Sequence, residues 1–202
     1  MSDVIDALQI ATESQLSEVN TMLPGTVVSY DAGRNRAVVR PTLPKALADG
    51  LPLDAPTVAE VPILWPASAG GAVFTMPIRP GDGVMLVFAQ RSLEGWLGGN
   101  NGAPDDPRRF DLSDAVAIPG LRASGPGADP DAVVLALDGA ILRLEPGGTA
   151  RLTVTKLVVE GNVEVSGKID CTGDVKAGLI SLQLHKTSLV QPGAGVSGVP
   201  VP

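Results

Sequence analysis

Few residues of this chain have the types and spacing that catalysis requires. The chain has one histidine, His185, close to its C-terminal end, and no G-x-S-x-G elbow accompanies it. A hydrolase needs a nucleophile, a base and an orienting group within hydrogen-bond reach. The adjacent Asp105 and Asp106 lie in a turn-rich stretch, where solvated carboxylates are commoner than a glycosidase pair. We therefore expect that the protein is not an enzyme.

Patterns that bind phosphate or nucleic acid are missing from the sequence as well. There is no G-x-x-x-x-G-K-[ST] loop, and Gly81-Asp82-Gly83 is typical of a hairpin turn rather than of a phosphate cradle. Aromatic residues make up 3% of the chain and the net charge is −7. Single strands need stacking aromatics and a basic groove, so nucleic acid is not an expected partner.

The location and redox state of the chain follow from its ends and its cysteine count. No run reaches the length of a membrane-spanning helix, and the acidic start MSDVIDAL is unlike a signal peptide. We expect a soluble protein that is not exported by a standard route. The single cysteine, Cys171, excludes an intrachain disulfide, and its place in the pattern described next predicts a small, buried apolar role.

A six-residue repeat organises residues 157–180, which read LVVEGN VEVSGK IDCTGD VKAGLI. Apolar residues hold the first and third positions, and glycine holds the fifth in the first three hexads. Side chains at i and i+2 point to one face of an extended strand, and glycine permits a sharp turn after them. The residues predicted to form this apolar face are Leu157, Val159, Val163, Val165, Ile169, Cys171, Val175 and Ala177.

Four hexads cannot enclose a core within one chain, because each short strand buries one narrow face and leaves both edges open. Three arrangements would solve this problem. A left-handed solenoid would need three hexads per coil, and a meander would have to fold onto another domain. Alternatively, three copies wind around one axis with their strands paired between chains. We favour the intertwined trimer, because it removes all the open edges.

Before the hexads, the sequence predicts a helix and a small β-barrel. Residues 3–22 carry an apolar stripe at helical spacing. We expect this helix to dock on the next domain, with self-association about a three-fold axis as the alternative. A proline-rich loop is expected over 42–57. Five short strands with one long loop fit an OB-like barrel. These strands are predicted at 25–31, 36–41, 61–66, 72–78 and 82–90.

The fold class is therefore mainly β. A helical turn over 91–99 is expected to place Trp96 over one end of the barrel, and residues 124–131 have the composition of a linker. The predicted parts are the N-terminal helix 1–23, the OB-like barrel 24–123, the linker 124–131, the trimeric β-helical shaft 132–180 and the apex 181–202.

Several motifs, taken in order, resemble one family. They are LPGTVVSYD, VPILWP, the block TMPIRPGDGVMLVFAQRSLEGW and the block RRFDLSDAVAIPGL. Their order and spacing resemble the N-terminal barrel of the Mu-type central-spike proteins of contractile phage tails, over roughly residues 20–121. The succession of barrel, hexads and tail is similar to that family over the rest of the chain.

The resemblance implies a homotrimeric central spike that belongs to the virion and is made in the host cytoplasm. Three OB barrels would form a collar on the baseplate hub protein, and the hexads would form a needle that pierces the host cell envelope when the sheath contracts. A bacteriocin-like or secretion-system relative, and a separate tip protein over the needle, stay open. The alternative from the residues is a non-enzymatic OB-like adaptor with a short β-solenoid that binds carbohydrate or nucleic acid.

The resemblance also bears on metal binding at the apex. In that family an H-x-H pair from each chain commonly holds one axial iron, and the matching positions here are His185 and Thr187. Three His185 rings would supply only part of an octahedron, and a threonine hydroxyl is a poor ligand for a transition metal. We therefore expect no cofactor, with iron on His185 as the alternative. Apolar packing is expected to seal the tip instead, through Leu182, Leu184, Leu189 and Val190.

Overall fold

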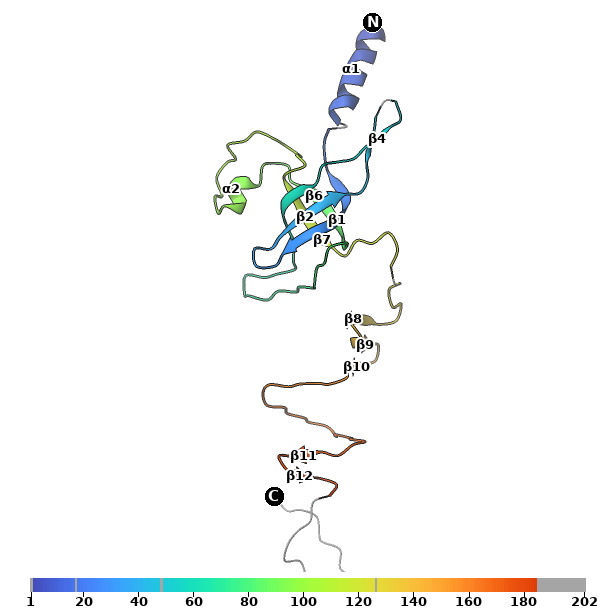
Figure 1. The fold of residues 1–202 in the computed structure, drawn as a ribbon, viewed down its shortest axis with the longest axis vertical. Helices are drawn as coiled ribbons and strands as arrows, with labels where there is room; N and C mark the ends of the chain where they lie inside the picture. Colours follow the sequence, from blue (N-terminus) through green and yellow to red (C-terminus); the bar gives the residue numbers. More distant parts are fainter. Residues whose placement is uncertain (1, 17, 48, 126, 185–202) are drawn as a thin grey trace, which may run out of the picture. The chain divides into compact units, whose positions relative to one another are not determined.

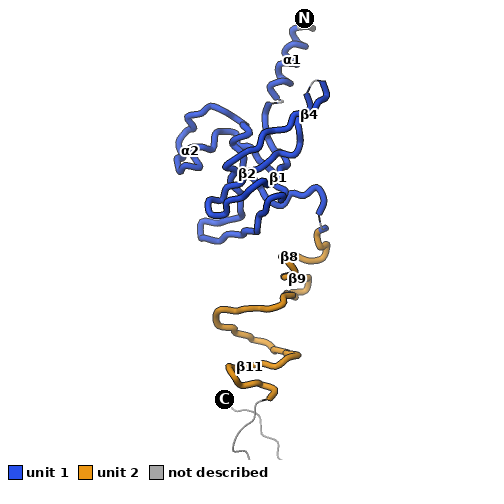
Figure 2. The backbone as a smooth tube through the Cα atoms, in the orientation of Figure 1, with its two compact units in different colours: residues 1–127 blue, residues 128–202 orange. Residues whose placement is uncertain are grey.

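The computed structural model describes residues 2–16, 18–47, 49–125 and 127–184. This part of the chain is mainly β, with a short N-terminal helix (Figure 1). Two compact units are present, Met1–Gly127 and Ala128–Pro202 (Figure 2). The division falls inside the stretch 124–131, whose composition is that of a linker.

Five strands of the first unit form one antiparallel sheet in the order β5-β2-β1-β6-β7. Figure 1 shows that this sheet is curled. They are β1 (Met22–Asp31), β2 (Arg36–Pro41), β5 (Val58–Pro62), β6 (Gly83–Phe88) and β7 (Ala115–Pro119). The two edges approach one another where Ile63, just after β5, forms a parallel bridge with Ala117 of β7. There the Leu64 N–H donates a hydrogen bond to the Ala117 carbonyl at 2.9 Å. The sheet is therefore a partly closed, barrel-like curl.

Period-two alternation along the strands places the core inside this curl. In β6, Val84, Leu86 and Phe88 are buried, and the residues between them are half-buried. This pattern arises because successive side chains of a strand point to opposite faces. Val27 from β1 and Val39 from β2 complete the same core. Burying each such valine or leucine contributes roughly 1.5–3 kcal/mol to folding.

The prediction of a strand at 72–78 is wrong. Among the described residues, Val73 forms only an isolated bridge with Ala67, and no strand covers this segment. The place beside β6 is taken by β7, which pairs with it over five residues. Pro77 lacks an N–H and cannot donate to a ladder. Residues 115–118 each have a backbone N–H, and this segment pairs with β6.

The proline-rich stretch 42–57 contains a minimal hairpin, β3 (Lys45–Ala46) paired with β4 (Pro52–Leu53). The strand expected at 61–66 lies closer to the N-terminus, in β5. Because Pro62 has no N–H to continue the ladder, the strand ends there.

The N-terminal helix, α1, spans Ser2–Leu16 and ends before the expected limit at residue 22. Met22 instead begins β1, where it lies opposite Val87 of β6. The expected docking on the barrel is also wrong for the single chain, because the apolar side chains of α1 are exposed, Ile5 at 62% and Leu8 at 64%. Since a helix of this length is marginal on its own, a covering surface would stabilise it.

The helical turn expected within residues 91–99 is present as α2 (Glu94–Leu97). Its Trp96 does not cover the barrel end as predicted, because the side chain is 61% exposed. The tryptophan that packs against the core is Trp65, which is half-buried and donates from Nε1 to Asn35 Oδ1 at 3.1 Å.

In the second unit, three strands form an antiparallel meander in the order β8-β9-β10. They are β8 (Val133–Leu137), β9 (Ala140–Glu145) and β10 (Thr149–Thr153). The first turn contains Asp138 and Gly139, with φ of 47° and 88°. Positive φ at both central residues is the requirement of a type I′ turn, whose twist suits a two-residue hairpin loop.

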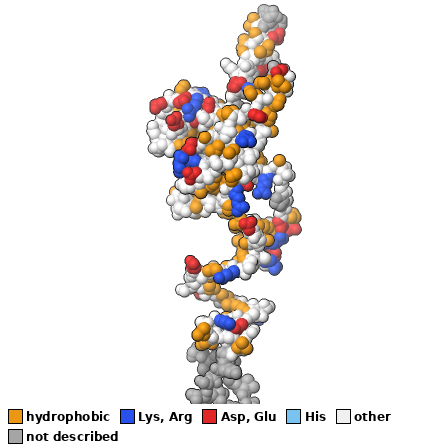
Figure 3. Space-filling view, in the orientation of Figure 1, with side chains coloured by type: hydrophobic (Ala, Val, Ile, Leu, Met, Phe, Trp, Pro, Cys, Tyr) orange, Lys and Arg blue, Asp and Glu red, His pale blue; other side chains and the backbone are white. Residues whose placement is uncertain are grey.

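The hexads form no core within one chain. From Val154 to Val175 the described chain has no strand, and a two-residue ladder then joins β11 (Lys176–Ala177) to β12 (Ile180–Ser181). All eight side chains of the predicted apolar face are exposed. Cys171 is among them, so the burial expected for it does not occur within the single chain. Figure 3 shows the same feature as hydrophobic side chains lying at the surface.

Gly83→Ala is expected to destabilise the first unit. A Cβ at Gly83 would lie 1.9 Å from the backbone oxygen of Leu121, a contact that only a backbone shift can relieve. Overpacking of this kind typically costs about 1–3 kcal/mol, and a backbone clash falls at the upper end. Chemical denaturation of the variant would measure the loss. Gly70→Ala is the control, because its Cβ would meet only Ser68 Oγ at 3.8 Å. Equal midpoints for the two variants would contradict the prediction.

Candidate functional site

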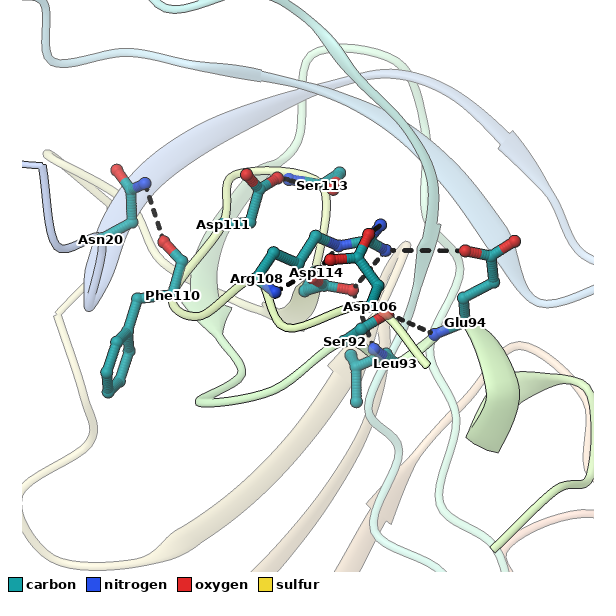
Figure 4. A network of polar contacts seen from close by, with 10 residues as sticks. All are labelled: Asn20, Ser92, Leu93, Glu94, Asp106, Arg108, Phe110, Asp111, Ser113 and Asp114. Carbon is teal, nitrogen blue, oxygen red and sulfur yellow. Dashed lines mark hydrogen bonds and ion pairs between the residues drawn. The ribbon is translucent and has the colours of Figure 1, made fainter. Parts of the chain in front are cut away.

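The most connected polar group of the first unit is a network around Asp114 (Figure 4). Asp114 immediately precedes β7 and is 2% exposed. Arg108 binds it through two bonds, from Nε to Oδ2 at 2.6 Å and from Nη2 to Oδ1 at 3.1 Å. The N–H of Leu93 also donates to Oδ1, at 2.8 Å. A buried carboxylate is thus held by a two-pronged guanidinium and a backbone donor, the strong class of charge-assisted hydrogen bond.

Arg108 joins further segments to this carboxylate. It donates from Nη1 to Asp106 Oδ2 at 2.7 Å, and its Nη2 lies 3.8 Å from Glu94 Oε2 of α2. The hydrogen bonds and charge of Asp114, with those of Asp106, raise the pKa of the Arg108 guanidinium above its usual range. The network therefore ties α2 and the loop before β7 to the curled sheet.

One side-chain and two backbone hydrogen bonds extend this connection to the residues just before β1. Asn20 donates from Nδ2 to the Phe110 carbonyl at 2.9 Å, and the Phe110 N–H donates to the Ala89 carbonyl at 3.1 Å. The Ala89 N–H in turn donates to the Asp114 carbonyl at 2.9 Å. Phe110 has φ of 50°, a left-handed conformation that is uncommon for an aromatic residue. The surrounding bonds hold it there.

The hydrogen bonds and ion pairs of this network hold segments of the first unit together. The Ser92 hydroxyl accepts from the Glu94 N–H at 3.4 Å, and the Ser113 hydroxyl donates to Asp111 Oδ1 at 2.6 Å. A cavity of about 470 Å³ lies beside the network, between α2 and residues 100–106. Asp106 lines it but is committed to Arg108.

Asp111 gives the first unit an acid-sensitive element. The Ser113 hydroxyl and then the Ser113 N–H, both donating to it, lower the pKa of Asp111 below its ordinary 3.8. A carboxyl with a depressed folded-state pKa contributes stability above its unfolded pKa, and this contribution is lost as pH falls through the folded value.

We therefore expect Asp111→Asn to reduce the acid sensitivity of unfolding below about pH 5. Thermal midpoints measured from neutral pH into the acid range would show a shallower slope for the variant than for the parent chain. Asp105→Asn, an exposed carboxyl of the same region, is the matched control and should keep the parental slope. A parental slope in Asp111→Asn would contradict the assignment.

The residues predicted as the shaft core lie in the described part of the chain, and all of them are exposed in the single chain. Leu182 and Leu184 of the predicted tip are exposed. The predictions for the apex concern residues outside the described part of the chain, namely His185, Thr187, Leu189 and Val190. Among the residues that are described, no cluster of three or more His, Cys, Asp or Glu side chains could hold a metal ion.

Sequence reasoning did not single out Arg108 and Asp114 as a pair. Both belong to the block RRFDLSDAVAIPGL, which entered only as part of a resemblance. The available signal was a charged residue directly before an apolar strand, since such a residue is drawn into the core edge and needs a partner.

Most of the first unit matches a known protein family. Residues 23–120 match the family model described as the phage protein Gp138 N-terminal domain. This range covers the curled sheet except Met22, the first residue of β1, and it includes both Arg108 and Asp114. No curated protein matches the chain. In the described residues, no helix has the length and apolar character needed to cross a membrane. The family match suggests a virion component, and it indicates a phage protein related to the tail baseplate or its spike.

Proposed function

We propose that this protein is the homotrimeric central spike of a contractile phage-tail baseplate, and that its role is mechanical rather than enzymatic. The observation that carries the proposal is the exposure of every predicted shaft residue in a single chain, from Leu157 to Ala177. Contiguous exposed apolar surface marks an interaction site. In a chain whose first unit matches a phage Gp138 domain, we assign that site to two further copies of the chain.

In the proposed trimer, the hexads of three chains wind around one axis and pair their strands between chains. Each apolar pair then faces the axis, and no strand edge stays open. The three curled sheets act as an OB-like collar on the baseplate hub. When the sheath contracts, the stiff needle concentrates the force on the host cell envelope.

His185 and Thr187 do not form the ligand set of the apical iron that the resemblance implies. Each chain supplies one histidine, His185, and the second position of the H-x-H pair is Thr187. Three imidazole nitrogens fill half of an octahedron, and threonine hydroxyls do not complete it for a transition metal. We therefore assign no step of the function to a metal.

The first test is the molar mass of the purified chain by light scattering after size exclusion, with metal analysis of the same peak. The proposal expects three times the chain mass of 20.6 kDa. A monomer would overturn it and favour an OB-like adaptor. Antibody labelling of assembled tails in the electron microscope then separates a spike from any other trimer. Label at the distal end of the baseplate is expected, and label elsewhere on the tail or none would contradict the assignment.

A further inference from the structure

The β8–β9–β10 sheet has one face on which every side chain is apolar. Directly opposed residues of an antiparallel ladder share one face. The central row of one face joins Leu135, Leu142 and Leu152, one residue from each strand. Every side chain of this face, which we call the aliphatic face, is apolar and exposed. Its members are Val133, Leu135, Leu137, Ala140, Leu142, Leu144, Ala150 and Leu152.

The opposite face has its own ionic partners. Arg143 is half-buried, pairs with Asp129 and donates from Nε to Glu145 Oε1 at 3.0 Å. Arg151 lies 3.5 Å from the same Glu145 oxygen. This face carries the charged groups of the sheet beside the apolar Val134, Ala136 and Ile141. The aliphatic face is left without cover by any described residue of the chain, although a sheet normally buries its apolar face.

The hexads that follow have an ambiguous register. Because the repeat is six residues long, a chain that slips by one hexad still presents an apolar first position, an apolar third position and, in most repeats, a glycine. Val165 or Ala177 would then take the place of Cys171. Glycine-rich strands with a repeating pattern specify their register weakly. The apolar pattern alone does not select one alignment of three chains.

The three-stranded sheet has no such ambiguity. Its two ladders hold five registered pairs each, and its first turn is the type I′ loop at Asp138-Gly139. No six-residue shift maps its aliphatic face onto itself. The sheet ends at Thr153, shortly before the first hexad position at Leu157. Fixing three sheets against one another would therefore fix the height of every hexad.

We propose that the aliphatic face of β8–β10 packs against the same face of two other copies and thereby sets the register of the hexads. The inference rests on the proposed trimer. The occupant follows from charge and continuity. A face without a single polar side chain fits a surface equally free of charge, and the chain's own copies bring that surface to the same level. The chain also continues directly from β10, through residues 154–156, into the hexads that meet the same copies in the proposed trimer.

The test uses the full chain and Cys171 as a natural reporter. In a common register, three Cys171 thiols lie at one level near the axis, and a mild thiol oxidant such as diamide joins two of them in a disulfide. The trimer holds one such bond and leaves the third chain free, so denaturing electrophoresis shows a cross-linked dimer. When one chain slips by a hexad, its Val165 or Ala177 faces the thiols of the other two chains, so one pair of thiols instead of three lies at one level and the disulfide forms more slowly.

The test variant is Leu135→Ser with Leu142→Ser, which removes two opposed side chains from the centre of the aliphatic face. We expect either loss of the trimer or a fall in the initial rate of dimer cross-linking to about half of the parental rate or less, because slipped alignments become populated. Val134→Ser with Ile141→Ser is the matched control. It removes the same class of side chain from the same two strands on the opposite face and should leave mass and cross-linking unchanged.

Trimers of the test variant with parental cross-linking would overturn the proposal and would point to a different protein as the occupant of this face. Equal losses in test and control variants would also overturn it, because the effect would not depend on the face. A trimeric parent chain in which neither Cys171 nor, in a Cys171→Ala background, Val159→Cys can be cross-linked would refute a common register. A monomeric parent chain would instead refute the proposed function itself.

Discussion

Replacing Arg108 by alanine is expected to lower the free energy of unfolding of the first unit by about 3 kcal/mol. The substitution leaves the Asp114 carboxylate buried. The donor that remains to it is the backbone N–H of Leu93, at 2.8 Å. Removing one partner of a buried pair is costly because the other charge is then uncompensated. We expect the lower end of the usual range, since the Arg108 side chain is itself 28% exposed.

Tryptophan fluorescence during denaturant unfolding is the appropriate measurement, because both tryptophans, Trp65 and Trp96, belong to the first unit. Arg34→Ala is the matched control. Its ion pair with Glu60, at 2.6 Å, lies between exposed side chains and should contribute about 1 kcal/mol or less. Arg108→Lys should lie between the two, because it keeps the charge and loses the bidentate geometry. An Arg108→Ala variant as stable as Arg34→Ala would show that the network is not an anchor.

Ile169→Asp is expected to abolish the proposed trimer. Ile169 holds the first position of the third hexad and is 70% exposed in the single chain. In the trimer this substitution would place three carboxylates around one axis in an apolar interior, where unpaired charges are strongly disfavoured. We expect the same result for Val163→Asp, one hexad earlier. Light scattering should report the mass of a single chain for both variants.

The matched control is Thr172→Asp, which introduces the same charge at the fourth hexad position, on the side that faces away from the axis. This variant should keep the parental mass. If Ile169→Asp formed a trimer as stable as that of Thr172→Asp, the inward assignment of the first position would fail, and with it the proposed packing of the hexads.

Local patterns were enough to predict the centre of the first unit. Alternation in GTVVSY, RAVVRP and VMLVF indicates strands whose buried members include Val27, Val39 and Leu86. The error at 72–78 has a physical origin. Val73, Phe74 and Met76 satisfy a composition rule for strands, but the position beside β6 is decided by which segment can pair along its whole length.

The network around Asp114 could not be predicted in the same way. It joins α2, a loop and the edge of a strand, and such a meeting leaves no periodic signal in the sequence. For the hexads, periodicity shows which side chains share a face. The structure of a single chain does not show what covers that face, because the described residues leave it exposed.

The exposed strands of the second unit have a consequence for how the protein is made. In the single chain, β8 and β10 are open sheet edges beside a wholly aliphatic surface, which is the combination that promotes aggregation. In the proposed trimer, the stability of this unit would depend on chain concentration, whereas the first unit carries its own core. Slow synthesis would therefore leave newly made chains open to proteolysis in their C-terminal half. Synthesis of many chains in one place, as on neighbouring ribosomes of one message, would protect them.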